Sequence, residues 1–172
     1  VLNPKRRTGS EHVWGTTTTD VLRLAKGIDV YACHRDDPEV AISSAIIAID
    51  GSRITEEVLA DSHAVLKPTP VEPSATHVIC VVPADKRKLT QRLLDQCNAY
   101  LQKSNWSSME VLIQDEDVTQ TLDAAIRNYD ADLLIIGSGE NHGLGWAIGS
   151  TTNDVLHDVS CDVLVVRPSV EQ

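Results

Sequence analysis

The chain has 172 residues, which is enough for one domain of ordinary size or for one domain and a fragment of another. Its net charge of −10 argues against nucleic acid as a partner, because neutralising phosphates requires a basic face. Apolar residues make up 42% of the chain and Phe is absent, so the core must be built from Val, Ile, Leu and Ala.

Membrane and export signals are not visible in the sequence. No apolar run approaches the roughly 18 residues of a membrane-spanning helix, and no signal peptide is seen. The four cysteines lack CxxC spacing and are interpreted as buried, reduced thiols: Cys33, Cys80, Cys97 and Cys161. We therefore expect a cytoplasmic protein without a membrane partner.

The beginning of the chain repeats a segment near its end. Val1-Leu2 looks like the end of a strand and falls, at an offset of 134 residues, on Ile135-Ile136. The segment GTTTTDVL from Gly15 is identical to GSTTNDVL from Gly149 at six of eight positions. After a one-residue slip, an apolar run at Ile28 to Cys33 falls on the run at Cys161 to Val166. An ungapped match of this length indicates an internal repeat.

The repeat predicts the domain organisation. Residues 1–34 are interpreted as the C-terminal part of a first repeat, residues 35–43 as a polar linker and residues 44–172 as a complete second repeat. An independent N-terminal arm is the alternative reading of residues 1–34.

Strands and helices alternate from residue 44 onward. Apolar runs rich in β-branched residues predict strands at Ala45–Ile49, His77–Val82, Met109–Ile113, Leu133–Ile136 and Asp162–Val166. Helical spacing predicts helices at Ile54–Leu66, Lys88–Lys103 and Val118–Tyr129, with a further helix opening at Gly149. This alternation predicts an α/β fold: an open five-stranded parallel sheet with helices on both faces, preceded by the fragment of the first repeat.

A glycine-rich loop follows the fourth of these strands. The glycines Gly137, Gly139, Gly143 and Gly145 can take positive φ and let a ligand approach the backbone. Gly149-Ser150-Thr151 then opens a helix whose first turn offers hydroxyls and unpaired N–H groups to an anion. The pattern suggests a phosphate site, although such loops also serve only to turn the chain.

Two other strand ends should lie beside this loop. In an open parallel sheet, ligands bind at the carboxyl ends of the strands near the switch in strand order. Asp50 ends the first strand of the second repeat, and Val81-Val82 ends the next. Asp50 could bind a ribose hydroxyl or a metal, or it could cap the helix that begins near Arg53 or Ile54.

No catalytic constellation stands out. The sequence has no HExxH motif, no Ser-His-Asp signature and no Lys in the glycine loop. His142 could touch a phosphate or lie in solvent. The acidic run Asp115-Glu116-Asp117 could hold a divalent ion, or it could serve as a helix entry stabilised by the helix dipole.

Three segments carry a family resemblance: IIAIDGS from Ile46, DAAIRNYDADLLIIG from Asp123, and GSTTNDVLHDVSCDVLVVRP from Gly149. They resemble the universal stress protein family, in the layout of members that carry two copies. The resemblance covers residues 44–168. It implies a Rossmann-like fold, similar to the adenine nucleotide alpha hydrolases, and it implies that ATP or AMP binds, with or without Mg²⁺.

The resemblance also implies a binding site. Nucleotide-binding members carry G-x-x-G-x9-G-[ST]. Here Gly139, Gly149 and Ser150 match its second half, whereas Glu140 departs from the first half. By this resemblance Asp50 and Val81 contact adenosine, and the loop and helix start contact the phosphates, through Gly137, Gly139, Gly149, Ser150 and Thr151.

Three functions remain open from the sequence. The first is a stress-response protein that binds an adenine nucleotide without fast turnover. The second is a dimeric scaffold whose glycine loop is vestigial, and the third is a slow nucleotide hydrolase. Family members commonly dimerise by antiparallel pairing of their last strands. Here Ile28 to Cys33 and Asp162 to Val166 could pair in that way within one chain, which would shield two sheet edges.

Overall fold

The computed structural model describes residues 20–22, 24, 25, 27–34, 41–50, 52, 54–83, 95, 108–114, 117–138 and 150–167. For Pro73, Val82, Pro83, Ser150 and residues 108–114 it describes only the backbone. Several predictions fall outside these residues: most of the helix at Lys88–Lys103, the glycines Gly139 and Gly149, and the side chains of Cys97, Asp115, Glu116 and His142.

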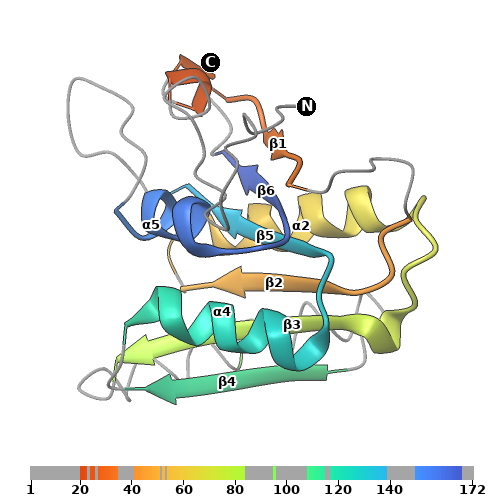
Figure 1. Ribbon diagram of the computed structural model, residues 1–172. Helices are drawn as coiled ribbons and strands as arrows, with labels where there is room; N and C mark the ends of the chain where they lie inside the picture. The colour runs from red at the N-terminus through yellow and green to blue at the C-terminus, as the bar shows by residue number, and fades with distance from the viewer. Residues whose placement is uncertain are drawn as a thin grey trace, which may run out of the picture.

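The centre of the fold is a six-stranded sheet with the strand order β1-β6-β5-β2-β3-β4 (Figure 1). Its strands are β1 (Val30–Ala32), β2 (Ala45–Ile49), β3 (Thr76–Pro83), β4 (Ser108–Gln114), β5 (Leu133–Gly137) and β6 (Asp162–Val166). Strands β2 to β6 pair in parallel, which confirms the predicted five-stranded parallel sheet. The sixth strand, β1, joins β6 in antiparallel orientation.

Helices cover both faces of the sheet, as predicted. They are α2 (Thr55–Leu66), α4 (Val118–Tyr129) and α5 (Ser150–Asp158), with a short 3-10 helix η1 (Pro73–Ala75) before β3. Alternate residues of the strands point to opposite faces, so that Ile46 and Leu134 pack with α4 and α5, whereas Ile47 and Leu133 pack with α2. In Figure 1, α4 and α5 lie on the near face of the sheet and α2 lies on the far face.

The antiparallel pairing predicted between the segments Ile28 to Cys33 and Asp162 to Val166 is present. Val30 lies opposite Val165, and Ala32 lies opposite Val163. β1 is shorter than the predicted run of Ile28 to Cys33: only its three residues pair with β6. In contrast, β3 extends one residue beyond its prediction at each end. Pro83 closes it opposite Gln114, a terminal position at which the missing N–H is tolerated.

The buried carboxylate of Asp162, the first residue of β6, binds two groups in and next to β1. Asp162 has no exposed surface, and its two oxygens accept hydrogen bonds from the hydroxyl of Tyr31 and the backbone N–H of His34, each at 2.7 Å. At the other end of β1, Asp29 Oδ1 accepts a hydrogen bond from the backbone N–H of Arg167 at 2.8 Å. These side-chain bonds flank the three-residue ladder at both ends.

The acidic run before α4 includes a helix cap. Asp117 accepts a hydrogen bond from the backbone N–H of Thr119 at 2.7 Å, which is the geometry of an N-cap. At least this member of the run has the helix-entry role rather than a metal role. Among the described residues, no group of three or more His, Cys, Asp or Glu side chains is placed to hold a metal ion.

Three of the four cysteines are buried and free, as predicted: Cys33, Cys80 and Cys161. Burial, followed by the charge of Asp162, raises the pKa of the Cys161 thiol from 9.0 to about 12. None of the described helices is both long and apolar enough to cross a membrane.

The raised pKa predicts slow alkylation of Cys161. At pH 8 its thiolate fraction should be about a thousandfold lower than that of an ordinary thiol, since each pKa unit is a factor of ten. Iodoacetamide labelling followed by peptide mass spectrometry should find Cys161 unmodified in the native protein and modified in urea. Because the folded pKa exceeds the unfolded one, this thiol supports folding at neutral pH and loses that contribution between about pH 9 and 12. Rapid labelling of native Cys161 at pH 8 would contradict this assignment.

Candidate functional site

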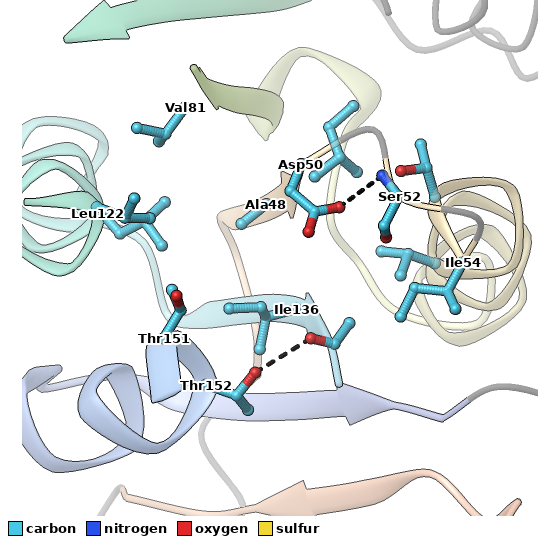
Figure 2. Close-up of a pocket in the computed structure, with 14 residues that line it drawn as sticks. Ala48, Asp50, Ser52, Ile54, Val81, Leu122, Ile136, Thr151 and Thr152 are labelled. Carbon is cyan, nitrogen blue, oxygen red and sulfur yellow. Dashed lines mark hydrogen bonds between the residues drawn. The ribbon is translucent and has the colours of Figure 1, made fainter. Parts of the chain in front are cut away.

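A cavity of about 200 Å³ lies at the carboxyl ends of β2, β3 and β5 (Figure 2). β2 lies between β3 and β5, so the strand order changes direction here and leaves a crevice. The lining residues come from these strands and from the adjoining ends of α2, α4 and α5: Ala48, Ile49, Asp50, Ser52, Ile54, Thr55, Val58, Val81, Val118, Leu122, Ile136, Gly137, Thr151 and Thr152.

One part of the cavity is apolar. Val81 of β3 and Leu122 of α4 approach it from one side, and Ala48 and Ile136 form the sheet beneath them (Figure 2). Ile136 and Ala48 are buried in the same hydrophobic cluster as Leu122. These walls suit a flat, apolar ring that is held mainly by van der Waals contact.

Asp50 supplies an exposed carboxylate at the rim. Its Oδ1 accepts a hydrogen bond from the backbone N–H of Ser52 at 2.8 Å, which closes the turn after β2 (Figure 2). The N-cap of α2 is Ile54, which has no side-chain cap, so Asp50 holds the turn and does not cap this helix. Asp50 Oδ2 has no hydrogen bond within the described part of the chain and can accept one from a ligand hydroxyl.

The first residue of α2 brings a buried hydroxyl to the cavity. Thr55 is only 6% exposed, and its Oγ1 has no hydrogen-bond partner. A buried polar group without a partner costs about 1–3 kcal/mol, so the fold leaves one hydrogen-bonding group unused next to the cavity. Thr55 was not predicted from the sequence, since a threonine at the start of a helix is ordinary.

Gly137 is required by packing. A Cβ built on it would lie 2.3 Å from Cδ1 of Ile54 and 3.0 Å from Cγ2 of Val58. Its φ is not among the positive values, so the conformational freedom expected for the glycine loop is not used here. The absence of a side chain instead lets α2 approach the end of β5, next to the cavity.

The N-terminal turn of α5 is fixed beside the same strand end. Thr152 is buried, and its Oγ1 donates a hydrogen bond to the backbone oxygen of Gly137 at 3.2 Å. Thr151 also lines the cavity and is partly exposed (Figure 2). Backbone N–H groups in the first turn of a helix have no intrahelical acceptor, so this end favours an anion.

The structure brings together four of the seven predicted site residues: Asp50, Val81, Gly137 and Thr151 all line the cavity. Ser150 begins α5, but its side chain is outside the description, as are the residues Gly139 and Gly149. Other lining residues were not predicted as site residues because only the tertiary fold brings them to the cavity, among them Ile54, Thr55, Val118, Leu122 and Thr152.

An open parallel sheet with a cavity at its switch point defines a Rossmann-like α/β protein. Residues 22–167 match the universal stress protein family, and the chain belongs to that family.

Individual relatives are similar over different lengths. Universal stress protein A homolog 2 of Coxiella burnetii is 51% identical over 41 residues, which are 24% of this chain and 28% of that protein. A putative universal stress protein from Pseudomonas aeruginosa superposes with a TM-score of 0.76 at 17% identity. That match covers 96% of this chain but only 62% of the longer Pseudomonas chain. The universal stress protein of Archaeoglobus fulgidus in complex with dAMP has a TM-score of 0.58 at 15% identity, over 74% of this chain and 100% of that chain.

Proposed function

We propose that the cavity binds an adenine nucleotide, ATP or AMP, and that the protein acts in the stress response by this binding, without fast turnover. The observation that carries the proposal is the placement of an apolar slot, a carboxylate and a helix N-terminus around one crevice at the switch point. An adenine ring, a ribose and a phosphate chain require these three features in that order.

Each part of the nucleotide has a suitable neighbour. The adenine ring would lie against Val81 and Leu122, and the ribose hydroxyls would donate to Asp50 Oδ2. The phosphates would lie at the first turn of α5, beside Thr151. Since Asp50 repels a polyphosphate, Mg²⁺ would arrive with ATP as a partial neutraliser. No described side-chain cluster holds the metal by itself.

Related proteins support this assignment. The Archaeoglobus fulgidus protein was solved in complex with dAMP, and another universal stress protein was solved in complex with cAMP. Both share the fold with TM-scores of 0.58. In those proteins the fold accommodates an adenine nucleotide, which favours the same ligand class here.

Nucleotide binding can be tested by calorimetry and thermal unfolding. Wild-type protein with ATP at 100 times its Kd should be stabilised by about 2.7 kcal/mol. Asp50→Ala should weaken binding about 10- to 100-fold, since it removes a charged hydrogen-bond acceptor. In Asp50→Asn the amide oxygen can still accept the hydrogen bond from Ser52 that closes the turn. Comparing this variant with Asp50→Ala therefore separates the effect of losing the charge from the effect of losing the turn.

The matched control is Asp154→Asn, which removes the same charge from an exposed position on α5 outside the cavity lining. It should leave the affinity unchanged. Absence of any ATP, AMP or adenosine binding by the wild type would favour the dimeric scaffold. Steady ADP production that is lost in Asp50→Ala would favour the hydrolase.

We also propose that residues 1–34 are the C-terminal part of a first repeat, residues 35–43 a linker and residues 44–172 the second repeat. Helical residues 20–22 followed by β1 reproduce the order of α5 followed by β6. The antiparallel contact of β1 with β6 is the contact expected between two last strands. The partial coverage of the longer Pseudomonas chain is consistent with this organisation.

A further inference from the structure

Two buried polar side chains without partners follow directly on β5 and β6. Arg167 is 3% exposed, and none of its guanidinium nitrogens, Nε, Nη1 and Nη2, has a hydrogen-bond partner. Ser138 is 1% exposed, and its Oγ likewise has none. Buried polar groups are normally hydrogen-bonded, so two exceptions at the carboxyl ends of adjacent strands require an explanation.

The two residues are neighbours across the sheet. Gly137 is in register with Val166, and the backbone N–H of Ser138 continues the ladder by donating to the oxygen of Val166 at 2.8 Å. Two residues earlier, Ile136 and Val165 pack in the cluster that contains α5. Strand alternation therefore directs Ser138 and Arg167 toward the face that α5 covers.

The positive charge of Arg167 requires an anion. Burial lowers the pKa of the guanidinium and the charge of Asp29 raises it, but an arginine remains protonated in proteins. The carboxylate of Asp29 accepts a hydrogen bond from the backbone N–H of Arg167 and none from the guanidinium, on which it acts only through its charge. A buried cation that lacks a hydrogen-bonded partner is strongly destabilising.

We propose that Arg167 and Ser138 form an oxyanion site that binds the terminal phosphate of the nucleotide. This inference rests on the proposed function, since the site adjoins the cavity through Gly137, whose oxygen is bonded by Thr152 of α5. A planar guanidinium can donate two parallel hydrogen bonds to a phosphate, and the serine hydroxyl can donate a third.

The site would supply a charge that the glycine loop lacks. Residues 137–149 contain neither Lys nor Arg, and they include Glu140. Backbone N–H groups carry only partial charges, so a polyphosphate bound near Asp50 needs a full cation. Arg167 is the described cation that is buried at the carboxyl ends of β5 and β6 and whose guanidinium makes no hydrogen bond.

Arg167→Met tests the site because it replaces the cation by an apolar chain of similar length. The variant should bind ATP and pyrophosphate about 10- to 100-fold more weakly than the wild type by calorimetry, while adenosine affinity stays within twofold. Its unfolding midpoint without ligand should equal or exceed that of the wild type, since an unpaired buried charge has been removed. Ser138→Ala should show a smaller loss in the same direction.

Arg127→Met is the matched control. It makes the same substitution at an arginine whose side chain is 74% exposed and pairs with Asp123 on α4. It should leave the affinity for ATP, pyrophosphate and adenosine unchanged.

The outcomes separate this inference from the proposed function. Equal ATP affinity in Arg167→Met and the wild type would overturn the inference and leave nucleotide binding intact. If the wild type binds no adenine compound but binds pyrophosphate in an Arg167-dependent manner, the oxyanion site stands and the proposed function fails. A ligand-free Arg167→Met protein that unfolds far more easily than the wild type would show that Arg167 is already paired, as with Asp29, and would overturn the inference.

Discussion

Gly137→Ala is expected to destabilise the protein by about 1–3 kcal/mol and to reduce ligand binding in the cavity. The added Cβ would lie 2.3 Å from Cδ1 of Ile54, far inside van der Waals contact. Ile54 and Val58 both line the cavity, so any movement that relieves this contact changes its shape. Urea unfolding would measure the loss of stability, and calorimetry with ATP would measure the loss of affinity.

A double-mutant cycle distinguishes packing from a backbone role in ligand binding. Ile54→Val removes the offending Cδ1 and should cost about 0.5–1.5 kcal/mol in the wild type, but less than that, or nothing, in Gly137→Ala. Ile47→Val is the control, because Ile47 is fully buried in the same cluster but is not among the nearest atoms around a Gly137 Cβ. Its cost should be the same in both backgrounds. If Ile54→Val costs the same unfolding free energy in Gly137→Ala as in the wild type, contact with Ile54 at the start of α2 is not the reason for glycine at position 137.

Asp162→Ala is expected to cost about 2–4 kcal/mol of folding free energy, since two donors lose their acceptor at a buried site. The donors are the hydroxyl of Tyr31 and the backbone N–H of His34, both at 2.7 Å. Tyr31→Phe removes one donor and leaves the carboxylate in place, and it should cost about 1 kcal/mol.

The two variants are compared by urea unfolding, together with amide hydrogen exchange in β1. Exchange at Val30 to Ala32 should accelerate more in Asp162→Ala than in Tyr31→Phe, because the hydrogen bonds from both Tyr31 and His34 are lost. Equal costs and equal exchange rates would mean that the bond to His34 contributes little.

Much of the fold is encoded locally. The predicted bounds of α4 and β6 agree with the structure at both ends. α4 has strong signals at its boundaries, since Asp117 caps its start and Asp130 ends it in the left-handed region with φ 48°. β6 is buried at every residue and is apolar apart from Asp162, a pattern that predicts a buried strand of a parallel sheet.

The candidate site was only partly predictable for a physical reason. Asp50 and Val81 could be found because strand ends on one edge of a parallel sheet must converge. Arg167 follows an apolar strand, where it looks like an ordinary exposed residue, and its burial becomes visible only in the folded structure. The role of Gly137 depends on the position of α2, which is distant in the sequence and carries no signal for that contact.

The seam between β1 and β6 has a consequence for how the chain holds together. Val30, Ala32 and Leu22 belong to the same hydrophobic cluster as Val155 of α5. Noncovalent forces therefore join the N-terminal segment to the rest of the domain along a shared interior. A single peptide-bond cleavage between Cys33 and Ala45 would leave two fragments whose apolar side chains still pack in one core. The chain between these residues therefore contributes to stability mainly by keeping the effective concentration of the two fragments high.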